Sequence, residues 1–476
     1  MTQKRAAVVG AGPNGLTAAA RLARAGWAVT VFEAQPTAGG AARSVRDALG
    51  PGTTVDFGAA AHPFGLVSPA LRELDFDDWL HAPLPLAHPL EGKPAALLRP
   101  GVEETAQGLG RDGQRWELIH RPMVEHPERH AANVLRPMAG WPPHPVDLVR
   151  FGLRAPWPAQ AMSTAFFREE PAQVLTLGSA AHALCPPSKP LTASLGVLFN
   201  SFGMADGWPV ARGGTQAIID HLLGQLGAVG GHVLCGRPIT SMDELVGTDG
   251  RQEWDAVVLD LAPRGVLGID GLRLPGRVAA SLRAWRYGPG VHKVDYRLSA
   301  PVPWADPAVG GAGTVHVCGG AEDIELAARQ VAAGQLPQRP FVMVCQQAVA
   351  DPSRGPVLWA YAQVPNGYRE AYPGQVTERI EAQIERFAPG FRDVVARRRA
   401  SSPAQLAAHD ANLVGGDIAA GAMSGLQMLA RPRLTFDPYR LADGVYMCSA
   451  ATPPGGGVHG MGGWNCAGRI LGQVRS

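Results

Sequence analysis

Lysine is scarce in this sequence: only four of its 43 basic residues are lysines (Lys4, Lys93, Lys189 and Lys293), and the others are arginines. A bias of this kind is typical of coding preference in a GC-rich genome, yet it draws attention to each lysine that remains. Excess charge is lacking as well, since the net charge is only +2. Because no basic patch is interleaved with aromatic residues, we expect no nucleic-acid partner.

Closely spaced cysteines are also missing. The six cysteines are Cys185, Cys235, Cys318, Cys345, Cys448 and Cys466. No two of them form a CxxC pair, which excludes a zinc ribbon and a CxxC redox disulfide. Separated cysteines are typical of buried free thiols in a reducing compartment, so we expect a cytoplasmic protein. No group of residues has metal-ligand spacing, and we predict no metal site.

No hydrophobic run approaches the roughly 18–20 residues that a transmembrane helix needs. We therefore expect a protein that is soluble or attached to a membrane surface. The chain of 476 residues suggests two or three domains at roughly 150 residues each. Its hydrophobic fraction of 46% against 18% charged residues is enough for a large packed core.

The N-terminal segment follows the order strand, glycine-rich turn, helix, strand and acidic residue. Ala6–Val9 is a short apolar run typical of a buried parallel strand, and residues 10–15 (GAGPNG) follow it directly. Leu16–Ala25 is rich in Ala and Leu and predicts a helix. Ala28–Phe32 predicts a second buried strand, which ends at Glu33.

This spacing has a physical meaning for a bound dinucleotide. Gly10 forms the tight turn, Gly12 lets the backbone approach a pyrophosphate, and Gly15 lets the helix pack close to the strand. The helix N-terminus offers free N–H groups and a positive dipole end to the phosphates. Glu33 is placed to accept hydrogen bonds from ribose hydroxyls. The predicted nucleotide-binding residues of this segment are Gly10, Gly12, Pro13, Asn14, Gly15 and Glu33.

Residues 34–43 (AQPTAGGAAR) indicate which nucleotide is bound. This segment resembles the N-terminal FAD-binding motif of the flavin amine oxidase and phytoene desaturase superfamily, in which a second glycine pair and an arginine close over the FAD pyrophosphate. The resemblance implies that Ala34, Gly39, Gly40 and Arg43 bind FAD. No second GxGxxG unit follows a later strand. A separate NAD(P)H domain is therefore not visible, which counts against a pyridine nucleotide–disulfide reductase.

Later segments return to the same predicted domain. Thr215–Leu226 has apolar residues at helical spacing, and His232–Cys235 and Ala256–Leu259 predict strands. In the superfamily this block belongs to the FAD domain, and the residue that matches Ile239 contacts the adenine side through its backbone. The resemblance also places Ala60 beside FAD, in a loop that borders the flavin in relatives.

The most specific segment is residues 444–465 (GVYMCSAATPPGGGVHGMGGWN), where a strand leads into a glycine-rich loop and a helix. It closely resembles the C-terminal signature of phytoene desaturase-like oxidoreductases, including the group typified by pyridine nucleotide-disulfide oxidoreductase domain-containing protein 2. The resemblance implies a helix N-terminus that favours negative charge on a reduced flavin. A glycine-rich packing turn is the alternative. The residues that this segment would place on FAD are Ala450, Gly457, Val458, His459 and Gly460.

The resemblance extends over the chain except for residues 85–165, and it implies an α/β fold with amine oxidase-like topology. A Rossmann-type, glutathione reductase-like FAD-binding domain is interleaved with an α+β substrate domain. The predicted segments are 1–75, 205–265 and 411–476 for the FAD-binding domain, and 76–204 and 266–410 for the substrate-binding domain. Val146–Leu153 predicts an amphipathic helix, either an ordinary helix of the substrate domain or a contact with a membrane surface. Val376–Phe387 predicts a second amphipathic helix.

Candidates for the chemistry come from the substrate half and from the two glycine-rich ends. Residues 288–296 (GPGVHKVDY) resemble the strand of flavin amine oxidases in which a lysine holds a water against flavin N5, which makes Lys293 a catalytic candidate. A structural lysine or a shifted register is the alternative. His62 and His459 are further catalytic candidates, and His182 and Trp464 are candidates for lining the substrate site. Each histidine has hydrogen-bonded packing as its alternative role.

The sequence thus predicts an FAD-dependent oxidoreductase that removes a hydride from a C–H bond of a lipophilic, polyene-like small molecule, with oxygen or a quinone reoxidising the flavin. A flavin amine oxidase acting on a C–N bond and a redox-neutral flavin isomerase remain open alternatives. A flavin-free binding protein, like the GDP-dissociation inhibitors that share this fold, is disfavoured by the intact glycines, Glu33 and Arg43.

Overall fold

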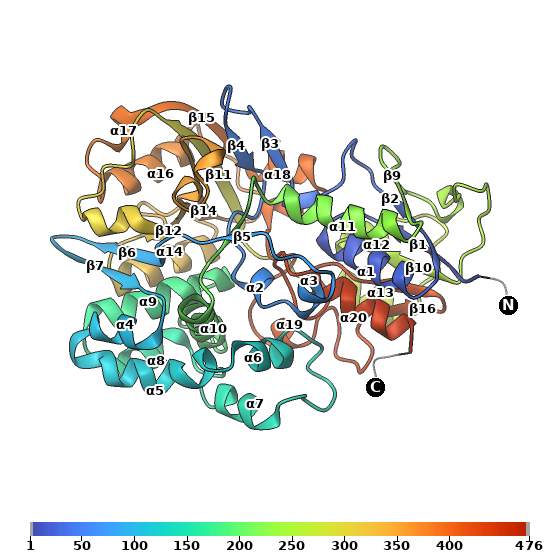
Figure 1. The fold of residues 1–476 in the computed structure, drawn as a ribbon, viewed down its shortest axis with the longest axis horizontal. Coiled ribbons are helices and arrows are strands. Elements are labelled where there is room, and N and C mark those ends of the chain that lie inside the picture. The colour runs from blue at the N-terminus through green and yellow to red at the C-terminus, as the bar shows by residue number, and fades with distance from the viewer. Residues whose placement is uncertain (1–2, 473–476) are drawn as a thin grey trace.

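Two β-sheets organise the chain in the computed structural model, which describes residues 3–472 (Figure 1). The first sheet has six strands in the spatial order β16 (Arg440–Ala442), β17 (Val445–Met447), β10 (Ala256–Leu259), β1 (Arg5–Val9), β2 (Ala28–Phe32) and β9 (His232–Leu234). All neighbouring strands are parallel except β16 and β17, which are antiparallel. This sheet lies at the right of Figure 1.

Helices cover both faces of the first sheet, which explains why its strands read as unbroken apolar runs. On one face, Ala6 and Val8 pack against α1 (Pro13–Arg24), α11 (Gln216–Ala228) and α20 (Met461–Ile470). On the other face, the alternate residues of β1 and β10 pack against α12 (Pro263–Leu267) and α13 (Gly276–Arg283). The sheet is therefore a doubly covered, Rossmann-type layer.

The second sheet has seven strands and lies at the left of Figure 1. Their spatial order is β15 (Val395–Ser401), β11 (Gly290–Leu298), β14 (Val357–Val364), β13 (Val342–Cys345), β12 (Ala312–Val317), β6 (Leu84–Leu90) and β7 (Lys93–Leu98). Its pairs are antiparallel apart from β6 and β12, which run parallel. One face packs on α16 (Gln375–Glu385) through Val294 and Ile380. The opposite side of β11 and β14 turns toward the first sheet and carries Val291, Trp359 and Tyr361.

A helical layer lies below β6 and β7 in Figure 1 and surrounds a separate hydrophobic core that includes Trp116 and Phe202. Its helices are α4 (Val102–Gln107), α5 (Gly113–Val124), α6 (Pro127–Val134), α7 (Pro145–Gly152), α8 (Ala159–Phe166), α9 (Glu170–Ala180) and α10 (Thr192–Ala205). The remaining helices of four or more residues are α2 (Pro63–Leu66), α3 (Pro69–Glu73), α14 (Ala321–Ala332), α15 (Gln347–Ala350), α17 (Phe391–Val394), α18 (Pro403–His409) and α19 (Leu426–Leu429). Short two-stranded pairs join β3 (Ser44–Arg46) to β4 (Thr54–Asp56) and β5 (Trp79–Leu80) to β8 (Val210–Ala211).

The predicted elements of the first sheet are present with small shifts. The strands at 28–32 and 256–259 have the predicted bounds, whereas α1 begins at Pro13 rather than Leu16 because proline suits the first turn of a helix. The predicted helix at 146–153 is α7, and its contact with a membrane stays a prediction. No helix within residues 3–472 is both long and apolar enough to cross a membrane.

The predicted domain segments stay a prediction, and the packing of the first sheet can be described beside them. All six strands of the first sheet come from the three segments assigned to the FAD-binding domain. However, α12 crosses residue 265 and α13 lies beyond it, and Val266, Leu282 and Trp285 share a core with β1 and β10. The residues packed on the second face of the parallel sheet therefore extend to Trp285.

Candidate functional site

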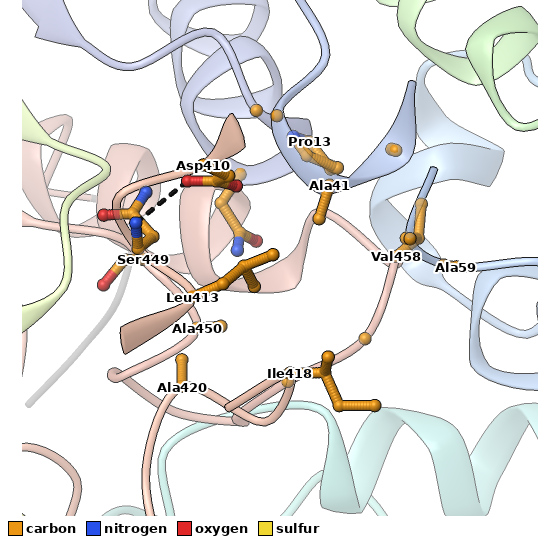
Figure 2. Close-up of a pocket in the computed structure, with 18 of the residues that line it drawn as sticks. Pro13, Ala41, Ala59, Asp410, Leu413, Ile418, Ala420, Ser449, Ala450 and Val458 are labelled. Atoms are coloured by element: carbon orange, nitrogen blue, oxygen red, sulfur yellow. Dashed lines mark hydrogen bonds between the residues drawn. The ribbon is translucent and has the colours of Figure 1, made fainter. Parts of the chain in front are cut away.

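A cavity of about 660 Å³ begins at the carboxyl ends of β1, β2 and β10 and reaches the inner face of the second sheet. This edge of an open parallel sheet is where ligands of such folds bind. Figure 2 shows how its wall combines distant parts of the chain, since Pro13 and Ala41 lie opposite Leu413 and Ala450. The cavity thus joins a nucleotide-type turn to an interior chamber.

Most of the sequence-predicted FAD contacts line this cavity. They are Gly10, Gly12, Pro13, Asn14, Glu33, Ala34, Gly40, Ala60, Ile239, Ala450, Gly457 and Val458. The first seven come from the β1–α1–β2 unit and the loop after it, and the last three come from the C-terminal signature. The fold therefore brings the two glycine-rich ends of the sequence to one site, although their roles in binding FAD stay a prediction.

The residues at this end have the properties that a dinucleotide requires. The Glu33 carboxylate is buried at the end of β2 and accepts hydrogen bonds from the backbone N–H groups of Ala11 and Gln35, both at 2.8 Å. Asn14 Oδ1 is buried without a hydrogen-bond partner, so it can accept one from a ligand. A Cβ on Gly40 would lie 3.4 Å from Gly12 Cα, so the two backbones leave a narrow cradle that a side chain would fill. The site fits an FAD dinucleotide on these grounds.

Three other predicted contacts take a supporting position instead of lining the cavity. A Cβ on Gly15 would lie 2.1 Å from Gly10 O, so Gly15 allows α1 to pack closely on β1, as predicted from its spacing. Gly39 adopts a positive φ of 135° in the turn before Gly40. The Arg43 guanidinium donates to Thr37 Oγ1 at 3.0 Å and contacts the His409 ring. Arg43 therefore reaches the cavity edge only through His409, which does line it.

The structure does not bring His459, Gly460 and Trp464 to the cavity wall. The buried His459 Nδ1 accepts a hydrogen bond from Met461 N at 3.1 Å, and its carbonyl accepts one from Ser68 Oγ at 2.6 Å. Burial lowers the pKa of His459 to about 4, so this ring is neutral and helps to begin α20. Trp464 lies on the side of α20 that faces α1, where the Arg21 guanidinium is 4.0 Å from its ring centroid. Close packing of α20 on α1 turns this residue away from the cavity.

Lys293 lines the opposite end of the cavity, on β11. Its Nζ forms a buried ion pair with Asp295 Oδ2, two residues along the same face of the strand. Trp359 and Tyr361 on the adjacent strand β14 also line the cavity beside it, with ring planes at 87°. Burial lowers the pKa of Lys293 and raises that of Asp295, although each charge opposes the shift of the other. A buried cation with one carboxylate partner and two aromatic neighbours is the main charged group of this chamber.

Both remaining histidine candidates line the cavity. His62 Nε2 lies 3.0 Å from the Thr215 hydroxyl, which itself donates to Ala59 O, so His62 is the donor in this bond. Burial lowers the pKa of His62 to about 4, with Arg354 adding to the effect and Asp56 opposing it. His182 Nε2 lies 3.0 Å from His316 Nε2, and burial lowers the pKa of His182 to about 4 as well. Both rings are therefore neutral at neutral pH.

Sequence reasoning missed two acidic residues of the cavity, Asp260 and Asp410. Asp260 directly follows β10, so the rule that parallel strands carry functional residues at their carboxyl ends could have found it. Asp410 ends the short helix α18, and its position gave no signal in the sequence. Trp359 and Tyr361 were also missed, because their role follows from the pairing of β14 with β11.

No group of three or more His, Cys, Asp or Glu side chains that could hold a metal ion occurs within the described part of the chain. All six cysteines are free, and only Cys235 is exposed. Burial raises the pKa of the other five thiols above the ordinary value. These thiols are therefore protonated packing groups at neutral pH.

Comparisons with known proteins agree with this geometry. Residues 8–74 match the family model of the NAD(P)-binding Rossmann-like domain. Pyridine nucleotide-disulfide oxidoreductase domain-containing protein 2 of Rattus norvegicus is 26% identical over an alignment 544 residues long. The alignment covers 97% of this chain and 92% of the rat protein. An oxidoreductase from Methanosarcina mazei has a TM-score of 0.63 at 17% identity, over 98% of this chain and 100% of that one. A variant of putrescine oxidase has a TM-score of 0.60 at 16% identity, over 99% of this chain and 100% of that one.

These similarities confirm the predicted resemblance and fold class. The chain is a distant relative of the rat protein, and it has a Rossmann-like α/β fold with the overall architecture of an amine oxidase. At these identities the solved structures establish the fold alone.

Proposed function

We propose that this protein is an FAD-dependent oxidoreductase that removes a hydride from a C–H bond of a neutral, lipophilic small molecule, in a desaturase-type reaction. The observation that carries the proposal is the distribution of charge along the cavity. Its three lining carboxylates, Glu33, Asp260 and Asp410, all belong to the dinucleotide end. At the other end, the cavity has no lining carboxylate among the described residues.

The chamber beyond the dinucleotide end is aromatic and apolar. Its lining includes Phe64, Leu195, Phe199, Trp208, Met343, Trp359 and Tyr361. Such a wall binds a polyene-like chain by burial of apolar surface, and aromatic rings add to this. An ammonium ion would meet there the Lys293 cation, whose Asp295 partner is already paired, and no lining carboxylate among the described residues, which is unfavourable in a buried site.

When bound, FAD supplies the two-electron oxidation, because its ring system can accept a hydride. The protein would hold the dinucleotide through Glu33 and the glycine-rich turns, and it would exclude water from the aromatic chamber. Lys293 would place a positive charge at the wall that the substrate and the flavin share. The neutral rings of His62 and His182 can offer or accept hydrogen bonds without adding charge. Oxygen or a quinone is the proposed acceptor that restores the oxidised cofactor.

A second candidate function, oxidation of an amine, is favoured by one observation. The Trp359 and Tyr361 rings stand nearly perpendicular at 5.2 Å beside Lys293, and paired aromatic rings of this kind can bind a neutral amine. The absence of a lining carboxylate beside Lys293 among the described residues favours the neutral C–H substrate over the amine.

The proposal is tested with the purified protein. We expect a yellow protein, and anaerobic addition of polyenes such as carotenoid precursors should bleach the flavin absorbance. Bleaching by aliphatic amines but not by polyenes would establish the second candidate instead. A colourless protein that stays colourless after reconstitution with FAD would exclude both.

A further inference from the structure

The Asp260 side chain occupies the centre of the glycine-rich turn. Its Oδ2 accepts a hydrogen bond from Gly15 N at 2.8 Å, close to the N-terminus of α1. A Cβ on Gly12 would lie 3.0 Å from Asp260 Oδ2, and one on Gly15 would lie 3.1 Å from it. Asp260 also lines the cavity, as do Gly12 and Asn14. The carboxyl therefore lies in the place where the spacing of the turn predicts a pyrophosphate.

The surroundings of Asp260 are acidic rather than basic. Burial raises its pKa to about 7, and the carboxylates of Asp410 and Glu33 add to the effect, while the Gly15 N–H opposes it. From the loop after α18, Asn412 Nδ2 donates to the Asp260 carbonyl at 3.0 Å. The thiols of Cys448 and Cys466, behind the carboxyl, are neutral because burial raises their pKa well above the ordinary value.

Positive charge near the turn is limited. Two arginines lie near these acids: Arg237 lines the cavity, and the charge of Arg43 opposes the raised pKa of Asp410. The Arg43 guanidinium is already engaged with Thr37 and His409. An FAD pyrophosphate is a dianion, so binding beside three ionised carboxylates would be repulsive. An ionised Asp260 would also compete with the phosphate for the Gly15 N–H, which is the kind of donor that a helix N-terminus offers to anions.

We propose that Asp260 is a proton-linked binding residue: it takes up one proton when FAD binds, and the protonated carboxyl donates a hydrogen bond to a pyrophosphate oxygen. A protonated carboxyl has one O–H donor and keeps acceptor capacity, so the same group can satisfy the phosphate and Gly15 N together. Proton uptake removes one of the three negative charges at the site. This inference rests on the proposed function, since it assumes that FAD is the ligand.

The test is the pH dependence of FAD binding to the apoprotein. Affinity is measured by quenching of flavin fluorescence between about pH 6 and pH 9. For a site that takes up one proton, we expect Kd to rise by about tenfold per pH unit above pH 7. In Asp260→Asn, the amide can accept from Gly15 N and donate to phosphate without a proton, so its Kd should be independent of pH and about 30-fold lower than wild type near pH 8.5. Asp270→Asn, at an exposed position, is the matched control and should keep the wild-type dependence.

A second measurement uses only the wild-type chain and does not depend on the folding of a variant. Calorimetric titration with FAD near pH 8, in two buffers of different ionisation enthalpy, should report the uptake of about one proton. Wild-type affinity that does not change with pH, or a slope that Asp260→Asn retains, would overturn the role of Asp260 while leaving FAD as the cofactor. Absence of FAD binding at every pH would instead overturn the proposed function, and the inference with it.

Discussion

Gly463 on α20 lies directly against Asn14 on α1, so that a Cβ on Gly463 would come within 1.8 Å of the Asn14 carbonyl oxygen. The contact joins the C-terminal signature to the first turn of the N-terminal helix. The neighbouring Gly462 is similarly restricted, since its Cβ would lie 2.5 Å from Cys448 O. The glycines of the C-terminal segment therefore act partly as packing residues that let the two ends of the chain meet at the cavity.

Gly463→Ala should destabilise the protein by about 3 kcal/mol, the upper part of the usual range for overpacking, because the obstructing atom is backbone. Gly224→Ala, within α11 where an added Cβ meets no atom within 4 Å, is the control and should be neutral or stabilising by up to about 1 kcal/mol. The urea midpoints of the two apoproteins give the comparison. Equal urea midpoints for the two variants would contradict the prediction, because they would show that α20 can move away from α1 without loss of stability.

Lys293→Met should slow reoxidation of the reduced flavin by oxygen. The buried ammonium favours the negative charge that develops as oxygen accepts electrons, and losing about 1.4 kcal/mol of such stabilisation slows the step about tenfold. Stopped-flow mixing of the reduced protein with oxygenated buffer measures the rate. Lys93→Met is the control, because Lys93 forms an exposed pair with Glu170. A rate unchanged in Lys293→Met would remove this role from Lys293.

Glu33→Gln should weaken FAD binding by about 10- to 100-fold, the effect of losing a hydrogen bond to a charged acceptor worth roughly 1.5–3 kcal/mol. The substitution keeps the size of the side chain, and Glu322→Gln on the exposed surface of α14 is the control. Equilibrium titration of each apoprotein at one fixed pH measures the change. If both variants bind FAD like wild type, Glu33 does not contact the ribose.

Arg354→Leu should destabilise the protein by about 3–5 kcal/mol at neutral pH, because it leaves Asp56 as a buried charge without its ion-pair partner. Both side chains are fully buried, and Arg354 Nη2 lies 2.5 Å from Asp56 Oδ2. Burial alone would raise the pKa of Asp56, but Arg354, Ser44 and Thr215 together lower it below the ordinary value.

The lowered pKa of Asp56 determines how the destabilisation caused by Arg354→Leu depends on pH. The ionised Asp56 contributes fully to the free energy of unfolding at pH values above the pKa of an aspartate in the unfolded chain. This contribution is lost as the pH falls through the lower pKa that Asp56 has in the folded protein. The difference in unfolding free energy between wild type and Arg354→Leu should therefore shrink on acidification below about pH 4. Denaturation curves at neutral and acidic pH test it, and a difference that grows in acid would contradict the assigned charge state.

Much of the dinucleotide end could be predicted from the sequence, because its signals are local. The order of β1, the glycine turn, α1 and β2 lies within a short segment, and each glycine has a steric reason that spacing alone reveals. The C-terminal signature was recognisable for the same reason. The sequence could not show that His459 and Trp464 turn away from the cavity, since that depends on how α20 packs on α1.

The sequence by itself determined the fold class and most of the residues that line the dinucleotide end. Tertiary structure alone decided which distant side chains share that site. Gly15 and Asp260 are 245 positions apart and meet only because β1 and β10 are neighbours in the sheet. Lys293 obtains its aromatic neighbours only through the pairing of β11 with β14. Charge and burial act through space, so the protonation of Asp260 and the ion pair of Lys293 depend on residues that spacing along the chain does not connect.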